Sequence, residues 1–240
     1  MKNAPSIFIR EMKAYFVSPI AYVVLIVFVI LTGFFFVAYF NWASFYQGEA
    51  SMNAIFLNMS ITMLFVAPLI TMRVFAEEKR SGTIEILMTS PVTDAEVVIG
   101  KFAASFALFI IMLALTFTCP LFLIIYGNPD VTPMLVGYLG LLLLGAAFIS
   151  LGVMTSSITK NQIVAALVSF VLLLGLWVIG WMSSTVGSQL GKVLSFMSLV
   201  EHFEDFSKGI LDTKHIVYYV SFAAFCLFLA VKSVQSAKWR

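Results

Sequence analysis

Charged residues are scarce in this 240-residue chain, where Asp, Glu, Lys and Arg together make up 11% of the sequence. Soluble domains contain about 25% charged and about 45–50% apolar residues, whereas 61% of this chain is hydrophobic. A protein with so little charge cannot present a water-compatible surface, so the composition excludes a soluble enzyme or binding domain. The net charge is only +2, which gives no electrostatic support for a nucleic-acid partner.

Side chains that bind metals or act as nucleophiles are equally scarce. The only cysteines, Cys119 and Cys226, lie within apolar segments, where we expect them to pack as small hydrophobic side chains. The two histidines, His202 and His215, stand alone, since neither belongs to a motif with metal-ligand spacing. The sequence therefore predicts no catalytic residues, no metal site and no cofactor bound by this chain.

Six stretches are long and apolar enough to cross a bilayer. A spanning helix needs about 20 mostly apolar residues to traverse roughly 30 Å of hydrocarbon. The predicted spans are residues 20–40, 54–72, 102–126, 134–155, 163–181 and 215–231. No internal repeat divides the chain into similar halves. The sequence thus predicts an all-α membrane protein with six transmembrane helices in a single domain.

The predicted spans offer no energy source of their own. None contains Asp, Glu, Lys or Arg, the groups that carry protons or ions through membrane proteins. The chain also lacks the G-x-x-x-x-G-K-[ST] loop that binds ATP phosphates, because Gly100-Lys101 is followed by phenylalanine and Gly191-Lys192 by valine. Transport would therefore need energy from another polypeptide.

Basic residues predict the orientation, because Lys and Arg collect in cytoplasmic segments. Eleven of the 14 lie before the first span, in segments 73–101 and 156–162, or after the last span. Only Lys192, Lys208 and Lys214 lie on the other side, in the loop of residues 182–214. We therefore expect a multi-pass protein of the cytoplasmic (inner) membrane with both termini in the cytoplasm.

Residues 1–19 have the pattern of a helix lying on the membrane surface. Apolar side chains recur at helical spacing, basic ones lie on another face, and Pro19 marks the junction with the first span. The apolar positions are Phe8, Met12, Tyr15 and Phe16, and the basic ones are Arg10 and Lys13. The alternative is an ordinary basic tail.

The segment of residues 73–101 is the most informative part of the chain. Gly82 permits a sharp turn after a charged helical extension of the second span, and Pro91 ends a short helix that would begin at Thr83. Thr93 and Glu96 have the spacing of a capping box that starts the next helix. The apolar side chains of the short helix are Ile84, Ile86, Leu87 and Met88. Such a rigid element could pass a partner's movement into the membrane; the alternative is a solvated hairpin loop.

This segment, FAEEKRSGTIEILMTSPVTDAEVVIGK at residues 75–101, resembles the signature between the second and third spans of ABC-2 type ABC transporter permeases. The resemblance extends to the six spans and the N-terminal surface helix. The ending KSVQSAKWR at residues 232–240 adds to this resemblance. With it, the chain is most similar to permeases of bacterial gliding motility and of copper-enzyme maturation.

The resemblance implies a permease subunit of an ATP-driven exporter with two permease halves, identical or different, and two cytoplasmic ATPase subunits that bind ATP and Mg. The residues implied in coupling to the ATPase are Gly82, Thr83, Ile84, Glu85, Leu87, Met88 and Pro91. Those expected to support the coupling segment are Glu77, Glu78, Lys79, Thr93 and Glu96, with Glu77 and Glu78 bracing the base of the second span. The turn at residues 156–161 would be a minor ATPase contact.

Two features of the opposite side are ambiguous. Apolar residues at helical spacing between Phe196 and Ile210 predict an amphipathic helix dipping into the outer interface, with a plain surface loop as the alternative. Met52, Met59 and Met63 share one helical face and could meet Cu(I), although methionine in a span more often serves packing.

Two other functions remain open from the sequence. The chain could be a membrane scaffold or assembly factor without transport, or a membrane-embedded enzyme. A scaffold would not stimulate ATP hydrolysis by a cognate ATPase. An enzyme would lose activity on replacement of a polar intramembrane residue such as Asn58 or Thr62.

The charge asymmetry yields a topology prediction. A reporter fused after Arg240 should show activity only in the cytoplasm, because basic segments stay there. A reporter inserted near Asp130 should show activity only on the opposite side of the membrane. Activity of the first fusion on the far side of the membrane would refute the arrangement.

Overall fold

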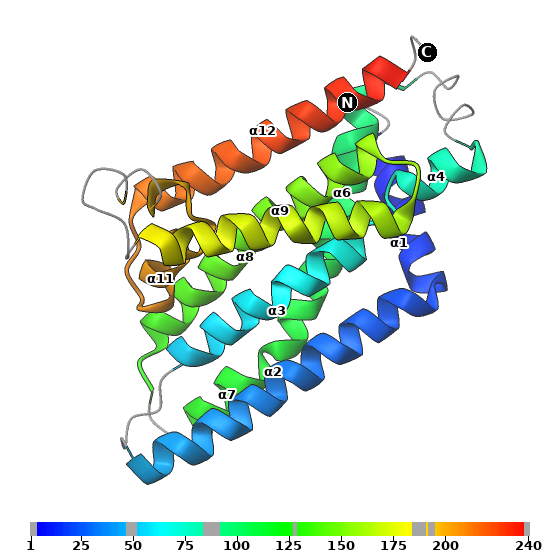
Figure 1. The fold of residues 1–240 in the computed structure, drawn as a ribbon. Coiled ribbons are helices and arrows are strands. Elements are labelled where there is room, and N and C mark those ends of the chain that lie inside the picture. The colour runs from blue at the N-terminus through cyan, green and yellow to red at the C-terminus, as the bar shows by residue number, and fades with distance from the viewer. Residues whose placement is uncertain are drawn as a thin grey trace.

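The computed structural model of this protein is built from helices (Figure 1). It describes residues 4–46, 52–83, 92–126, 129–183, 191 and 195–237, and within these ranges no strand occurs. The helices are α1 (Ala4–Val17), α2 (Pro19–Tyr46), α3 (Asn53–Thr71), α4 (Ala76–Ser81), α6 (Asp94–Thr116), α7 (Thr118–Tyr126), α8 (Val131–Ile158), α9 (Gln162–Ser183), α11 (Leu199–Ser207) and α12 (Thr213–Ala237).

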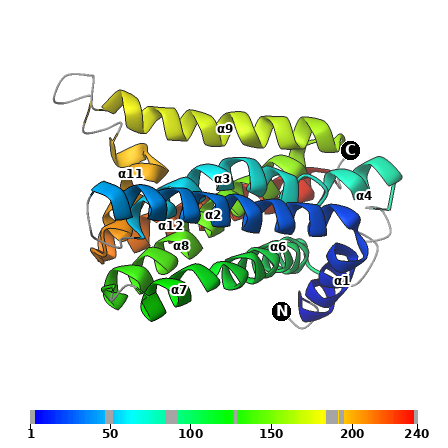
Figure 2. The ribbon, with the colours of Figure 1, turned by 90° about the horizontal axis from the view of Figure 1, so that it is seen from below.

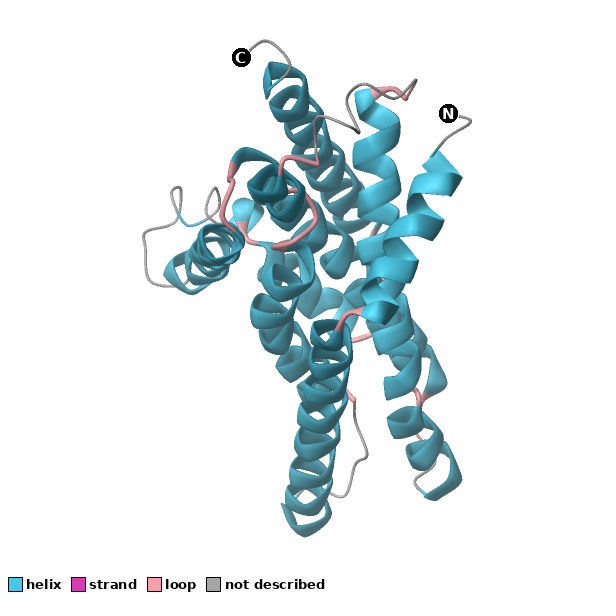
Figure 3. Ribbon diagram, turned by 90° about the vertical axis from the view of Figure 1, so that its right-hand side faces the viewer, coloured by secondary structure: helices cyan, strands magenta, loops and turns pink. Residues whose placement is uncertain are grey.

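The structure confirms the predicted fold class, an all-α membrane protein, because six segments are long and apolar enough to cross a membrane. They are Pro19–Asn41, Asn53–Ser81, Asp94–Tyr126, Val131–Ile158, Gln162–Gly180 and Thr213–Ser236. The long helices run along the bundle, and both chain ends lie at the same end of it (Figures 1 and 3). Outward-facing side chains such as Ile30, Leu167 and Val217 are more than 60% exposed, as expected for surfaces that face lipid. Which side of the membrane the termini occupy stays a prediction.

Two predicted spans are interrupted near one end. The helical extension expected after the second span is broken, since α3 ends at Thr71 and a turn separates it from α4. The third span also divides, into α6 and α7 at Phe117. Pro120 explains this second break, because it has no N–H to donate to the carbonyl four residues earlier. At the other end, α6 begins at Asp94, directly after the predicted Thr93 cap, so Lys101, which lies just before the predicted span, belongs to a helix and not to a loop.

Helix α8 is the centre of the bundle, in contact with α3, α6, α9, α11 and α12. Its glycines let neighbouring side chains reach its backbone, which is how small residues permit close helix packing in membranes. A β-carbon added at Gly145 would lie 2.0 Å from the Phe109 ring, and one at Gly137 would lie 2.2 Å from the Phe56 ring. At Gly152 it would lie 2.1 Å from the Thr71 hydroxyl. These contacts pack α6 and α3 directly onto α8.

The N-terminal helix predicted on residues 1–19 is present as α1, with a buried side formed by Ile7 and Tyr15. It packs on α6 where Gly100 leaves room, since a β-carbon there would lie 3.0 Å from Ile7. Figure 2 shows α1 turned away from the direction of α2. One side of α1 therefore belongs to the protein core, and Phe16 remains exposed.

At the opposite end of the bundle from α1, helix α11 covers the ends of the long helices (Figure 1). The predicted amphipathic helix is thus present, although its apolar residues Leu199, Phe203 and Phe206 are fully buried in the protein rather than turned outward. Phe206 lies against α8, because a β-carbon at Gly140 would be 2.5 Å from it. The apolar side of α11 is therefore satisfied by packing within the chain.

The glycines of α8 yield a packing prediction. Gly145→Ala should lower the thermal stability of the detergent-solubilised protein by about 1–3 kcal/mol, the usual cost of overpacking a core, because Phe109 occupies the required space. Gly175→Ala in α9 is the matched control, since a β-carbon there meets nothing within 4 Å. Equal melting temperatures for the two variants would contradict the close packing.

Candidate functional site: the charged junction of α1, α4 and α6

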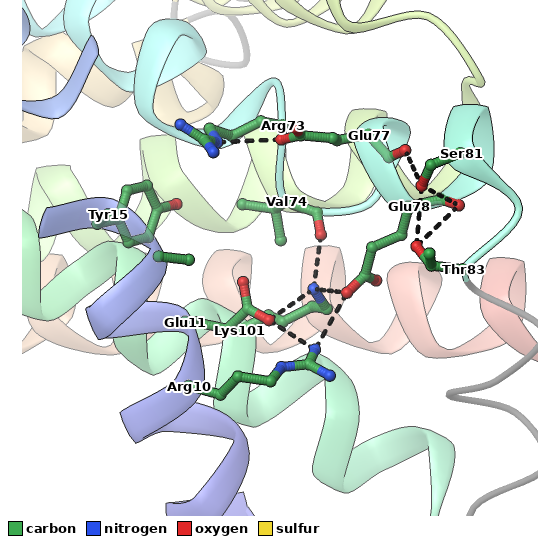
Figure 4. A pocket seen from close by; sticks show the side chains of 11 residues that line it. Arg10, Glu11, Tyr15, Arg73, Val74, Glu77, Glu78, Ser81, Thr83 and Lys101 are labelled. Carbon is green, nitrogen blue, oxygen red and sulfur yellow. Dashed lines mark hydrogen bonds and ion pairs between the residues drawn. The ribbon is translucent and has the colours of Figure 1, made fainter. Parts of the chain in front are cut away.

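A cluster of opposite charges joins three helices at the end of the bundle that carries both termini (Figure 4). Lys101 of α6 lies at its centre with a side chain only 1% exposed. Its ammonium contacts the Glu11 carboxylate of α1 at 3.1 Å and the Glu78 carboxylate of α4 at 2.9 Å. It also donates to the carbonyl of Val74 at 2.8 Å. All three of its N–H donors are thus placed within reach of oxygen acceptors.

Arginines extend this cluster toward the surface. The Arg10 guanidinium lies 2.7 Å from Glu11 and 3.0 Å from Glu78, so both carboxylates receive two cations. Arg73 pairs with Glu77 at 3.2 Å and also donates to the hydroxyl of Ser18, between α1 and α2. The ion pairs therefore connect α1, the turn after α3, α4 and α6.

Burial and the neighbouring cations act on the Glu11 carboxylate in opposite directions. Burial raises its pKa by disfavouring the charged form, but Lys101 and Arg10 outweigh this effect and hold the pKa below its ordinary value. A carboxylate whose pKa is depressed by folding stabilises the protein above its unfolded pKa. That stability is lost as the pH falls through the lowered pKa of the folded state. At neutral pH, above this pKa, Glu11 is ionised.

A cavity of about 490 Å³ opens beside these residues. Its walls come from α1, α4, α6 and the turn after α3. The second carboxylate oxygen of Glu78 is buried there and has no hydrogen-bond partner within the described part of the chain. The lining residues labelled in Figure 4 are Arg10, Glu11, Tyr15, Arg73, Val74, Glu77, Glu78, Ser81, Thr83 and Lys101, and Ala14 completes the lining.

Ser156, near the end of α8, fixes the break between α3 and α4. Its hydroxyl donates to the carbonyl of Met72 at 3.1 Å and accepts from the N–H groups of Phe75 and Ala76 at 3.1 and 3.2 Å. Backbone groups freed by the break are therefore satisfied by one buried side chain. This contact explains why the chain can turn here, and it ties α4 to the central helix.

Lys79 and Ser157 make a second link between α4 and α8. The Lys79 ammonium donates to the carbonyl of Ser157, and Ser233 of α12 donates to the same carbonyl at 2.9 Å. The turn predicted as a minor ATPase contact thus begins with residues that hold α4 in place. All three predicted supports on α4 make contacts within the chain: Glu77 with Arg73, Glu78 with Lys101 and Arg10, and Lys79 with Ser157.

Both ends of the predicted coupling segment are anchored in this junction. Gly82 ends α4 with a φ of 74°, a left-handed conformation that favours glycine. At the other end, the capping box is confirmed: Thr93 accepts from the N–H of Glu96 at 3.3 Å, and the Glu96 carboxylate accepts from the N–H of Thr93 at 3.0 Å. Thr83 is exposed beside Ser81, with 2.9 Å between their hydroxyl oxygens.

The remaining predicted coupling residues lie outside the described residues, and their part in coupling stays a prediction. These are Ile84, Glu85, Leu87, Met88 and Pro91.

Sequence reasoning missed the central member of the cluster. The charge pattern places Lys101 among the charges of a cytoplasmic loop, and nothing in the surface-helix pattern of residues 1–19 singles out Glu11. The one available signal was that Lys101 follows Gly100 inside an apolar pattern, which is unusual for an unpaired lysine.

The methionine face is also clearer in the structure, because Met52, Met59 and Met63 are all buried within the apolar core. Within the described ranges, no three His, Cys, Asp or Glu side chains form a group suited to a metal ion.

The cluster yields a stability prediction. Lys101→Met should lower the free energy of unfolding by about 3–5 kcal/mol, because it leaves Glu11 and Glu78 without their buried cation. The control is Lys208→Met, which removes a surface pair with Glu204 at 3.4 Å and should cost about 0.2–1 kcal/mol. Thermal melting in detergent distinguishes them, and equal losses would show that Lys101 is not the centre of the junction.

Comparison with known proteins identifies the family. The model of the ABC-2 family transporter protein matches residues 6–234, almost the whole chain. No curated protein sequence matches the chain significantly. The match covers the charged junction, five candidate spans completely and the sixth up to residue 234. The chain therefore belongs to the ABC-2 family of transporter proteins and is a membrane-spanning permease component of an ABC transporter.

Proposed function

We propose that this chain couples ATP hydrolysis by a separate cytoplasmic ABC ATPase to the export of a substrate across the inner membrane, as one of two permease halves. The observation that carries the proposal is the charged junction, which connects both ends of segment 82–93 to the spanning helices. The resemblance to gliding-motility permeases favours a role in that process. ATP and Mg would be bound by the partner, since this chain has no phosphate-binding loop.

Movement applied to segment 82–93 would reach the membrane by two routes. On one side, α4 is bonded to α8 through Ser156 and Ser157 and to α1 through Glu78. On the other side, α6 begins at the Thr93 cap and carries Lys101 seven residues later. Because Lys101 also contacts Glu78, the two routes meet in one ion pair. A displacement of the segment would therefore move α1, α4 and α6 together.

Apolar side chains in this segment supply the partner contact in the proposal. In the sequence, Ile84, Ile86, Leu87 and Met88 follow the polar stretch of residues 77–81. Apolar side chains at a water-facing surface usually mark a site for another protein. Burying two of them in the ATPase would contribute roughly 3–6 kcal/mol, at about 1.5–3 kcal/mol each.

The test is a double substitution, Ile84→Asp with Leu87→Asp, in the permease co-expressed with its ABC ATPase. We expect the complex to dissociate at least about 100-fold more readily, in line with the lost burial energy, while membrane insertion is unchanged. Co-purification in detergent and ATP hydrolysis in reconstituted vesicles are the measurements.

The matched control replaces two exposed apolar residues at the opposite end of the bundle, Ile210→Asp with Leu211→Asp. This control should leave ATPase binding intact. If the Ile84 and Leu87 variant still binds and still stimulates hydrolysis, coupling through segment 82–93 is wrong. If the wild-type protein binds the ATPase without stimulating hydrolysis, the chain is a scaffold rather than a transporter.

A further inference from the structure

The two histidines of the chain meet at the end of the bundle opposite the charged junction, which corrects the expectation that they stand alone. His202 of α11 and His215 at the start of α12 are 8% and 4% exposed. Their Nδ1 atoms lie 2.6 Å apart, which is hydrogen-bond distance. The Nε2 atom of His202 lies 3.0 Å from the carbonyl oxygen of Phe196, and that of His215 lies 2.8 Å from the Asp205 carboxylate.

The contacts of this arrangement require three hydrogens on the ring nitrogens. Two neutral histidines provide only two. The carbonyl of Phe196 only accepts, so Nε2 of His202 must carry a hydrogen. An ionised Asp205 also only accepts, so Nε2 of His215 must carry one too. The contact between the Nδ1 atoms then requires a third hydrogen, because two bare nitrogen lone pairs at this distance repel. Two neutral imidazoles supply only two hydrogens.

We propose that His202, His215 and Asp205 form a binding site for a single proton that fastens α11 to α12. With this proton the three side chains together are electrically neutral, since one imidazolium balances one carboxylate. A neutral group is far less costly to bury than an unbalanced charge. Without the proton, two ring hydrogens must serve three contacts, so either the hydrogen bond between the Nδ1 atoms or the contact of His215 with Asp205 is lost.

The geometry favours His215 as the ring that donates through both nitrogens, because its Nε2 lies 2.8 Å from the Asp205 carboxylate. Burial lowers the pKa of His202, and the neighbouring His215 and Lys214 act in the same direction, whereas the hydrogen bond to the Phe196 carbonyl and the Asp205 carboxylate oppose them. His202 is therefore the neutral ring, which accepts through Nδ1 and donates through Nε2. His215 donates through both nitrogens, to His202 and to Asp205, and the carboxylate stabilises its charge.

The surroundings leave few other charges to compete for this proton. On α11 itself the remaining acidic residues are Glu201 and Glu204, and Glu204 pairs with Lys208. Lys214 of α12 pairs with Asp212 at 3.0 Å. The other helices in contact with α11, namely α3, α8 and α9, contain no Asp, Glu, His, Lys or Arg. Asp205 is thus the carboxylate in direct contact with the histidine pair.

Two neighbouring tyrosines hold α11 to α12 independently of this proton. The hydroxyl of Tyr219 donates to the carbonyl of Leu199 at 2.5 Å, and that of Tyr218 donates to the carbonyl of Met197 at 2.8 Å. These bonds hold the start of α11 to α12 at any pH below the titration of tyrosine. The histidine pair adds a contact at the middle of α11 that is present only while the proton is bound. With the expected topology, the compartment outside the cytoplasm supplies this proton.

The test uses the fact that the sequence contains only two histidines. The full-length chain, purified through a tag without histidine and labelled with ¹⁵N-histidine, is placed in lipid nanodiscs with a metal chelator. Nitrogen NMR spectra are then recorded over the range of about pH 5 to 9, where histidines titrate. We expect three of the four ring nitrogens to carry hydrogen in the lower part of this pH range. Only two should carry hydrogen at its upper end.

Two variants sharpen the result. Asp205→Asn should lower the pH at which the third hydrogen is lost by about 1 unit or more, a tenfold weaker proton affinity, because it removes the opposing charge. Glu204→Gln, one residue away on the exposed side of α11, should leave that pH unchanged. Since the wild-type titration alone reports the proton count, the test stands even if a variant fails to fold.

Three outcomes would overturn the proposal. The first is a wild-type spectrum with only two protonated nitrogens across the whole range. The second is a spectrum in which both rings become doubly protonated together, as isolated surface histidines would. The third is a spectrum that differs with and without chelator, together with one bound metal ion per chain, which would show that a metal rather than a proton joins the rings.

Discussion

The burial of the Lys101 ammonium is the constraint on which the end of the bundle that carries both termini depends. A charge with 1% exposure can be accommodated only if opposite charges are brought to it. Glu11 and Glu78 come from helices that lie far from Lys101 in the sequence, so satisfying one ammonium fixes α1 and α4 against α6. The break after α3 places α4 where Glu78 can reach Lys101. The Ser156 hydroxyl stabilises this break by accepting hydrogen bonds from the N–H groups of Phe75 and Ala76.

Within the membrane the same bundle is held by shape rather than by charge. Apolar side chains gain little from leaving lipid, so helices in a bilayer associate through close packing. Helix α8 supplies the necessary space with glycines, into which Phe56, Phe109 and Phe206 fit. The protein thus combines an apolar, closely packed middle with polar connections at its two ends, namely ion pairs at one and the histidine pair at the other.

Much of this fold could be predicted from the sequence, because the strongest signals are local. Hydropathy predicted six apolar segments, and the spacing of Thr93 and Glu96 predicted the start of α6. What could not be predicted depends on contacts between distant residues. Ser156 lies 81 residues from Phe75, and Lys101 lies 90 residues from Glu11. The meeting of His202 with His215 likewise requires the turn after α11, for which a regular period gives no indication.

The depth of Lys101 also determines how the junction responds to its solution. Mobile counter-ions weaken attraction between exposed charges over a distance of about 8 Å at physiological ionic strength, and they screen buried pairs much less. Arg10 has a side chain that is 52% exposed, whereas that of Lys101 is 1% exposed. The inner bonds of the cluster should therefore respond less to the salt content of the surrounding water than the outer contacts of Arg10 do, so that α1, α4 and α6 keep one mutual arrangement over a wide range of ionic strength.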